Sequence, residues 1–507
     1  MNYIQAKGKQ LYSGEEPVLL RGFGLGGWLL PEGYMWKFYT KCDRPRRIEE
    51  MITELCGQDY ADTFWTRYCD RYIAKSDVAL IASEGFNSVR LPINARHYRE
   101  HLPYIDALID WCREYGVYVI LDMHAAPGGQ TGQNIDDTEN DMPELFTEEK
   151  YRMELISLWR DIAARYRDEP VVAGYDLLNE PLPDWWSRYN VLLMPLYGEL
   201  IASIREIDTN HLIILEGAHW ASDFSVFADW EPPAGETNLL LQFHKYWNNP
   251  DAASLEPFLA QRDRLGLPLF MGEGGENNSD WYTGAFPLYE RLGISWSFWS
   301  YKKMDNTNSP ISFPVPEGWQ RLLAYLDGGE APSKAEAAGI YDRFLDAITD
   351  TSVNTQVLKA LKREAPLTIP CEFYDGFSVA KPHKPGAELN AQDHVNIIFA
   401  DGHRGIPDYK RYNGEPQPDS ENIIVLLEQN EWLEYRFTAP ESRSYTIDVT
   451  TLPAEGVLEI RCGDVSQSYT SNNADSLSCS VLLEEGPHTV RLHCKEGKAA
   501  LDTVGIH

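Results

Sequence analysis

The chain has 507 residues, and 77 acidic side chains against 45 lysines and arginines give it a formal charge of −32. Hydrophobic residues make up 43% of the chain, which is enough for a large folded core and excludes intrinsic disorder over most of its length. So strong an acidic excess repels phosphate backbones and anionic lipid, and it argues against nucleic acid or a membrane surface as a partner. The chain is also rich in aromatic residues, with 15 Trp and 28 Tyr, and such rings either fill cores or stack on sugar faces.

From about residue 19 to residue 300 the chain repeats a short apolar run, a polar turn and an amphipathic helical stretch. Strands that alternate with helices predict a parallel sheet, and eight continuously apolar strands favour a closed (β/α)8 barrel, the TIM barrel of the α/β class. A doubly wound sheet is the alternative, but the glycines at 22–27 lack the GxGxxG spacing of its first turn. The expected strands are 19–25, 86–93, 117–124, 173–180, 211–217, 239–244, 268–273 and 294–300.

The pattern changes after the helix-like stretch 355–365, where prolines follow at positions 366 and 370. Beyond Cys371 short runs of alternating polar and apolar residues are separated by turns rich in Pro, Gly and Asp. This is typical of an antiparallel β-sandwich, here of the jelly-roll kind. We therefore expect a barrel domain over 1–365 and a sandwich domain over 366–507.

The eight cysteines are far apart and show no CxxC spacing, so neither a metal site nor a redox pair is predicted. Free, packed thiols fit this spacing best, while a bridge between Cys462 and Cys494 stays open. No apolar run approaches the roughly 18 residues of a membrane helix. Residues 1–17 contain no apolar stretch that could act as a secretory signal, so we expect a cytoplasmic protein, or a secreted one whose leader was removed.

Two glutamates stand at predicted strand ends, where the reactive groups of a (β/α)8 barrel emerge. Glu180 ends the fourth strand and Glu273 the seventh. Glycoside cleavage needs such a pair, because one carboxyl group must donate a proton to the leaving oxygen while the other stays ionised and attacks. Asn179 can hydrogen-bond a sugar 2-hydroxyl, and the permanent charge of Arg90 would keep a neighbouring carboxylate ionised, which suits Glu273 as the nucleophile.

Further polar and aromatic residues follow other strands. Tyr246 could donate to Glu273, His124 and His244 offer donors on the wall of the site, and Trp299 offers a flat apolar floor for a pyranose ring. None of these roles requires a cofactor or a metal. Each residue alone also has an ordinary structural explanation, such as a capped turn or a core tryptophan. Their joint placement on matching strand ends is what favours a site.

Seven segments of the first domain carry a resemblance to a known family: LRGFGLGGWLLPE (20–32), GFNSVRLPI (85–93), LDMHAAPGGQTG (121–132), YDLLNEP (175–181), LQFHKYW (241–247), GEGG (272–275) and SWSFWSYK (295–302). Through them the domain resembles glycoside hydrolase family 5, and within it the exo-β-1,3-glucanases known from yeasts. The resemblance implies that Glu180 is the general acid/base and Glu273 the nucleophile of a retaining double displacement on a β-glucan or gluco-oligosaccharide. It also implies that Glu32 binds outer hydroxyls of a terminal glucose, which would favour exo cleavage, and that six further residues shape the subsite of the sugar whose bond breaks. Those residues are Arg90, His124, Asn179, His244, Tyr246 and Trp299.

The chain departs from that branch on the side of the leaving group. Gln133 and Asn134 stand where the yeast enzymes have a phenylalanine and an aspartate, and glycines rather than Trp-Ser follow Glu273. An aromatic residue from another loop could bind the leaving sugar instead, although ordinary packing explains each candidate equally well. The candidates are Trp220, Trp247, Trp281 and Tyr282. Alternative functions are an endo-β-1,4-glucanase, another β-glucosidase such as one that acts on glycolipids, and a sugar-binding protein without activity.

Three segments of the second domain, 369–377, 430–449 and 484–506, carry a further resemblance. Through them the domain resembles carbohydrate-binding modules of families 6 and 35. Its aromatic candidates for sugar binding are Tyr409, Tyr412 and Trp432, of which Trp432 lies in a predicted strand and suits the core. A domain that only supports the barrel or mediates self-association is the alternative.

Overall fold

The computed structural model describes residues 1–39, 41–471 and 476–507. Its contacts divide the chain into two compact units. The first unit holds Met1–Lys245, Pro257–Gly275 and Gly293–Val353, and the second holds Tyr246–Glu256, Glu276–Leu292 and Asn354–His507. Two short segments that follow barrel strands therefore belong to the second unit, together with the C-terminal part of the chain.

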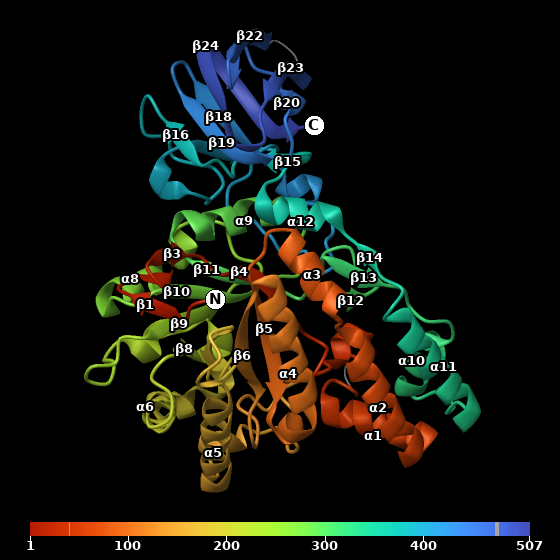
Figure 1. Ribbon diagram of the computed structural model, residues 1–507. Coiled ribbons are helices and arrows are strands. Elements are labelled where there is room, and N and C mark those ends of the chain that lie inside the picture. Colours follow the sequence, from red (N-terminus) through yellow and green to blue (C-terminus); the bar gives the residue numbers. More distant parts are fainter. Residues whose placement is uncertain (40, 472–475) are drawn as a thin grey trace. The chain divides into compact units, whose positions relative to one another are not determined.

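The first unit contains a closed barrel of eight parallel strands, which confirms the predicted fold class (Figure 1). Each strand overlaps one of the eight predicted runs, and the pairing of the last strand with the first closes the ring. In ring order the strands are β4 (Arg21–Gly24), β5 (Ser88–Asn94), β6 (Tyr118–Ala125), β7 (Val172–Asp176), β8 (Leu212–Glu216), β9 (Leu239–His244), β10 (Leu269–Gly275) and β11 (Ser295–Trp299).

Amphipathic helices follow the barrel strands. The helix α5 (Glu149–Tyr166) shows why they form, because its buried residues Leu155, Trp159 and Ile162 recur every three or four positions and make one apolar face. Other helices of the first unit are α1 (Pro45–Cys56), α2 (Gln58–Tyr72), α3 (Lys75–Ser83), α4 (Tyr98–Tyr115), α6 (Leu193–Arg205), α10 (Trp319–Leu326) and α11 (Lys334–Ala347). The helix α8 (Glu256–Leu265) lies in this unit from Pro257 onward.

A small antiparallel sheet precedes the barrel, and the sequence pattern did not predict it. It consists of β1 (Ile4–Lys7), β2 (Gln10–Ser13) and β3 (Glu16–Val18). Its buried Ile4 and Leu11 share one apolar cluster with Leu212, Leu240 and Phe270, which lie at or next to the first residues of barrel strands. The sheet therefore closes the N-terminal end of the barrel with apolar side chains and leaves chemistry to the opposite end.

Many aromatic residues pack in the core of the first unit. Trp36 and Phe64 contact Trp319 or Phe344 at ring-centroid distances of 4.5–6.4 Å. In the sequence, Trp319 and Phe344 lie between the second and third strands of another small sheet, made of β12 (Lys302–Met304), β13 (Ile311–Phe313) and β14 (Ser352–Val353). Packing thus explains part of the high aromatic content, and composition alone does not indicate sugar binding.

The second unit contains an antiparallel β structure, as predicted for the C-terminal part of the chain. Its longest strand, β24 (Gly486–Ile506), has 21 residues. The first half of β24 pairs with β19 and β21, and the second half pairs with β15, β18 and β20, so one strand joins two sheets. The other strands are β15 (Leu367–Pro370), β16 (Gly376–Ser378), β17 (Asn396–Phe399), β18 (Ile423–Glu428), β19 (Trp432–Ala439), β20 (Arg443–Leu452), β21 (Gly456–Cys462), β22 (Val465–Ser471) and β23 (Ser476–Leu483). The helices of this unit are α9 (Ser279–Arg291) and α12 (Thr355–Lys362).

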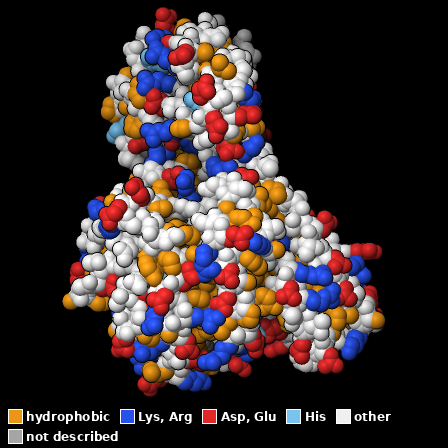
Figure 2. All heavy atoms as spheres, in the orientation of Figure 1, with side chains coloured by type: hydrophobic (Ala, Val, Ile, Leu, Met, Phe, Trp, Pro, Cys, Tyr) orange, Lys and Arg blue, Asp and Glu red, His pale blue; other side chains and the backbone are white. Residues whose placement is uncertain are grey.

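All eight cysteines lie in the described part of the chain, and each is free and buried, so no bridge joins Cys462 to Cys494. On the face shown in Figure 2, lysines and arginines are interspersed with aspartates and glutamates rather than gathered in one basic area. Among the described residues, no helix has both the length and the apolar character needed to cross a bilayer.

Candidate active site

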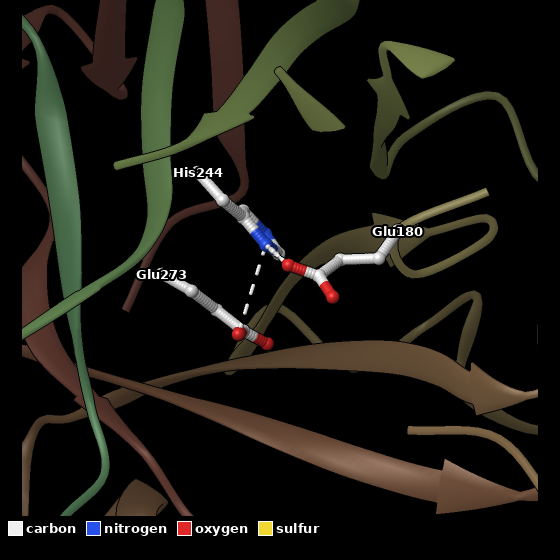
Figure 3. Close-up of side chains that lie close together, drawn as sticks. All are labelled: Glu180, His244 and Glu273. Carbon is white, nitrogen blue, oxygen red and sulfur yellow. Dashed lines mark hydrogen bonds and ion pairs between the residues drawn. The ribbon is translucent and has the colours of Figure 1, made fainter. Parts of the chain in front are cut away.

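Glu180 and Glu273 meet at the C-terminal end of the barrel. An oxygen of each carboxyl group and a ring nitrogen of His244 all lie within 4.8 Å of one another (Figure 3). Glu273 lies within β10, whereas Glu180 lies four residues beyond β7, because that strand ends at Asp176 rather than at residue 180. Glu180 has a left-handed φ of 45°, and its backbone N–H donates to Oε2 of Glu216 at 2.6 Å. That bond holds an unfavourable backbone conformation that turns the carboxyl group toward Glu273.

Arg90 links most of the site through one guanidinium group. It is fully buried in β5, and its Nη1 donates to Oε1 of Glu273 at 2.5 Å. Its Nε donates to Oδ2 of Asp176 at 2.8 Å, and its Nη2 donates to Oδ1 of Asn179 at 2.8 Å. A buried arginine needs such partners, because an unpaired charge away from water is very costly. Arg90 thus fixes the orientation of both Glu273 and Asn179.

Four residues beneath the site were not predicted. They are fully buried at positions inside or at the end of barrel strands, and three of them contact Arg90 or its partners through carboxylates. The residues are Asp122, Asp176, Glu216 and Gln242. Their signal in the sequence is a charged or amide residue within an otherwise apolar run. Glu216 stands near the end of the predicted strand 211–217, so the strand-end criterion applies to it directly.

Burial shapes the charge of this network. It raises the pKa of Asp176 to about 6, against the opposing charge of Arg90. It also raises the pKa of Glu216, with His244 opposing the rise. Burial disfavours the charge on Arg90, but the surrounding carboxylates outweigh it and raise the pKa of the guanidinium well above its ordinary value. The arginine is therefore permanently charged. Because burial raises the pKa of Asp176 and of Glu216, these two carboxyl groups carry less negative charge than their number implies.

His244 connects the two glutamates. Its Nδ1 lies 2.7 Å from Oε1 of Glu180 and 3.6 Å from Oε2 of Glu273, and its Nε2 lies 3.5 Å from Oε1 of Glu216. Burial lowers the pKa of His244, but Glu216, Glu273 and the bond to Glu180 outweigh it and raise that pKa well above the ordinary value. Burial also raises the pKa of Glu180, with Glu273 and Glu216 adding to the rise and His244 opposing it. Glu180 is thereby set to hold a proton, as a general acid must.

His124 and Trp299 form one wall of the site. Their rings stack 5.3 Å apart with an interplanar angle of 5°. Nδ1 of His124 lies 2.7 Å from Oδ2 of Asp122, while burial and the charge of Arg90 lower the pKa of the ring to about 4. His124 is therefore neutral near pH 7, unlike His244. Nδ2 of Asn179 lies 3.4 Å from Nε2 of His124, which ties this wall to the rest of the site.

The remaining predicted site residues lie in two places. Glu32 is buried in the loop between β4 and the short helix η1 (Gly33–Trp36). Tyr246 belongs to the second unit, and its contact with Glu273 stays a prediction. In the first unit the structure links seven predicted residues through the contacts above: Arg90, His124, Asn179, Glu180, His244, Glu273 and Trp299.

The cluster of Glu180, His244 and Glu273 also has the ligand types of a metal site. The carboxylates around His244 raise the pKa of its ring, and a protonated imidazole donates hydrogen bonds. The same trio can therefore exchange protons.

The four aromatic candidates for the leaving-group side differ in exposure. Trp281 and Tyr282 on α9 are fully buried, so packing explains both of them. Trp247 lies in the second unit, with its ring 4.4 Å from that of Tyr412. Trp220 follows β8 in the first unit and contacts the ring of Trp185 at 6.0 Å.

A parallel barrel that brings two carboxyl groups together beyond the C-terminal ends of its strands has the groups that glycoside cleavage needs. Residues 52–305 match the family model described as cellulase (glycosyl hydrolase family 5). That match covers half of the chain, and the chain belongs to glycosyl hydrolase family 5, which confirms the predicted family.

The chain is similar to three curated relatives that carry different enzyme names. It is 29% identical over 347 residues to a β-xylosidase of Phanerodontia chrysosporium, covering 60% of this chain and 71% of the relative. It is 26% identical over 310 residues to endoglucanase C of Acetivibrio thermocellus, covering 48% and 88%. It is 27% identical over 241 residues to a probable glucan 1,3-β-glucosidase A of Aspergillus fumigatus, covering 45% and 57%.

Proposed function

We propose that the chain is a retaining exo-acting β-glucanase that removes terminal glucose from β-1,3-glucans and their oligosaccharides by double displacement. The observation that supports this proposal most is that two adjacent carboxyl groups have different electrostatic surroundings. Glu273 accepts a 2.5 Å bond from the permanently charged Arg90, whereas burial and neighbouring carboxylates raise the pKa of Glu180. Retaining enzymes hold their two carboxyl groups about 5–5.5 Å apart, and oxygens within 4.8 Å suit that spacing.

In the first step the carboxylate of Glu273 attacks the anomeric carbon. A bond forms between this carbon and a Glu273 oxygen while the glycosidic C–O bond breaks, and Glu180 gives its proton to the departing oxygen. Asn179, held by Arg90 at 2.8 Å, is placed to donate to the sugar 2-hydroxyl, where a bond strengthens in the transition state. The product of this step is a glycosyl-enzyme ester.

In the second step Glu180, now ionised, takes a proton from water as the water oxygen attacks the same carbon. The ester bond to Glu273 breaks, glucose leaves with its β configuration retained, and Glu180 is protonated again. Loss of the Glu180 proton between the steps leaves a negative charge beside His244, whose Nδ1 lies 2.7 Å away. The protonated ring stabilises that charge.

Glu32 supports the exo mode and the preference for glucose. Glu32 is 2% exposed in the loop after β4, where its carboxyl group can accept hydrogen bonds from the outer hydroxyls of a terminal sugar. A probable glucan 1,3-β-glucosidase among the relatives agrees with this proposal, whereas the endoglucanase points to internal cleavage.

A product profile tests the proposal. Laminarin, lichenan and cello-oligosaccharides are incubated with the full chain, and the anomeric configuration is followed by NMR. We expect β-glucose from laminarin in the first minute. Oligosaccharides released first from lichenan or cello-oligosaccharides would show endo cleavage, and α-glucose would show an inverting mechanism.

A further inference from the structure

A cavity of about 910 Å³ lies in the first unit between α4 and the helices α1 and α2 (Figure 1). The loop after β4 lines it through Trp28, Leu29 and Pro31, and the end of β5 lines it through Asn94. Glu32, the next residue of that loop, does not line it, and neither does any other described residue of the candidate active site. The cavity is therefore a separate recess, and its volume falls within the range of about 300–1,000 Å³ that small-molecule sites occupy.

Three aromatic rings line this cavity. Trp65 on α2 and Tyr104 on α4 are half-buried, while Trp28 is buried. Trp65 stacks on Trp36 with ring centroids 5.9 Å apart, and Tyr104 meets Trp28 edge-on at 6.3 Å. The neighbouring rings hold Trp65 and Tyr104 in place, and both keep part of their surface for a ligand. Amphipathic rings of this kind can stack on the apolar faces of sugars.

Polar groups of both signs line the same cavity. Glu50 on α1 and Asp62 on α2 bring carboxylates, which accept hydrogen bonds. Arg46 and Arg96 bring guanidinium groups, which only donate them. The carboxylates repel an anion and the guanidinium groups repel a cation, so a net charge on the ligand is disfavoured in either sense. A neutral ligand whose hydroxyl groups both donate and accept suits this lining.

Three buried polar atoms of the lining residues have no hydrogen-bond partner within the described part of the chain. They are Nε of Arg46, Nε1 of Trp65 and Nδ1 of His101. Burial and the charge of His97 lower the pKa of His101 to about 3, so its ring is neutral near pH 7. Buried polar atoms without partners are costly, and hydroxyl groups that reach these atoms remove that cost.

We propose that this cavity, called here the α2 cavity, binds gluco-oligosaccharides and segments of glucan chains without cleaving them. Sugar faces stack on Trp65 and Tyr104, while sugar hydroxyls bond to the carboxylates and guanidinium groups. The inference rests on the proposed function for the kind of sugar, since the ligand is the polymer whose ends the active site removes. A chain held here raises the concentration of chain ends near the active site.

The test is affinity electrophoresis of full-length variants in laminarin gels, which gives a Kd for the polysaccharide. Thr66→Arg places a long side chain in the cavity, because Thr66 lines it from an exposed position on α2. We expect it to raise the Kd at least threefold. Trp65→Ala removes a ring instead of filling the cavity, and we expect the same rise. The kcat/KM for laminaribiose should stay within about twofold in both variants, since the active site is separate.

Thr63→Arg is the matched control. Thr63 is also exposed on α2, and the hydroxyl group of each threonine donates to the carbonyl oxygen four residues earlier. Thr63 does not line the cavity, however, so the Kd should stay within about 1.5-fold. The two arginine variants carry the same charge, and only the one in the cavity should lose laminarin binding.

The outcomes separate this inference from the proposed function. An unchanged Kd in Thr66→Arg, or an equal change in both arginine variants, would show that the inference is wrong. A larger loss of laminaribiose turnover in Thr66→Arg would also overturn it, because the cavity would then belong to the active site. Spermidine binding that only Thr66→Arg abolishes, with laminarin binding unchanged, would show a cation site instead. If the unmodified chain does not hydrolyse laminaribiose but Thr66→Arg still weakens laminarin binding, the proposed function fails and this inference stands.

Discussion

The two ends of the barrel use burial in opposite ways. At the N-terminal end, Ile4, Leu11 and Phe270 belong to an apolar cluster that β1 and β2 help to close. At the C-terminal end the same strands bury Arg90 with carboxylates that contact it at 2.5–3.1 Å. Apolar burial stabilises the fold at about 1.5–3 kcal/mol per large side chain, whereas buried ion pairs cost desolvation free energy and are often no better than a hydrophobic replacement. Full burial of a residue therefore contributes to stability at the N-terminal end of the barrel, whereas at the C-terminal end it serves the proposed chemistry.

The largest expected effect is on Glu273, the proposed nucleophile. Glu273→Gln should lower kcat on nitrophenyl β-glucoside by several orders of magnitude, because an amide cannot form the ester intermediate. Binding of laminaribiose should persist, measured by calorimetry. The exposed Glu330→Gln is the matched control and should keep full activity. Turnover by Glu273→Gln near the unmodified rate would contradict the assignment.

Removal of the central cation should affect both stability and activity. Arg90→Met leaves buried carboxylates without their partner, and we expect a loss of about 3–5 kcal/mol in the free energy of unfolding, together with loss of hydrolysis. Denaturant unfolding and aryl-glucoside assays measure the two effects. A loss below about 1 kcal/mol would show that the carboxylates become protonated at little cost.

The opposite end should respond only in stability. Leu11 is 3% exposed, and Leu11→Ala should cost about 2–5 kcal/mol by the same unfolding measurement. The value of kcat/KM should stay within about twofold, because Leu11 lies in the cluster at the far end of the strands. A drop in kcat/KM at temperatures where the variant is folded would contradict the division between the two ends.

A smaller effect is expected in the pH dependence. The raised pKa of Glu180 keeps it protonated to higher pH, so activity falls as the pH rises through that value. Protonated His244 opposes this rise, and His244→Gln should therefore raise the pKa of Glu180 and move the alkaline limb of kcat/KM to higher pH. His403→Gln, at an exposed position, is the control. A shift toward lower pH would show that His244 does not carry the charge assigned to it.

The smallest expected effect concerns the second unit, whose sugar binding stays a prediction. Tyr412 is 52% exposed beside Trp247, whereas Tyr409 is buried and Trp432 lies under Arg491. Tyr412→Ala should weaken binding to laminarin about two- to fivefold in affinity electrophoresis and leave laminaribiose turnover unchanged. If the Tyr412→Ala variant and the unmodified chain have the same mobility in laminarin gels, Tyr412 does not bind laminarin, which would favour a supporting role for the second unit.

The barrel could be predicted from the sequence because its strands are continuous apolar runs. The strand-end criterion also placed Glu273, since parallel strands bring their C-terminal ends together, whereas Arg90 lies inside β5 rather than at its end. The N-terminal sheet escaped prediction because strands of three or four residues show too little alternation. Asp122 and Asp176 were missed because only the last residues of each predicted strand were inspected, while their side chains lie deeper. The left-handed turn at Glu180 has no sequence signal, since it depends on a bond to Glu216 from a different strand.

The strand β24 has a consequence for synthesis of the chain. It follows in sequence all five strands with which it pairs, so neither sheet of the second unit can be completed until the ribosome has made residues 486–506. Until then those strands expose unpaired edges, which are prone to aggregation. A premature stop before β24 would remove the shared member of both sheets, although Glu180 and Glu273 would already have been translated.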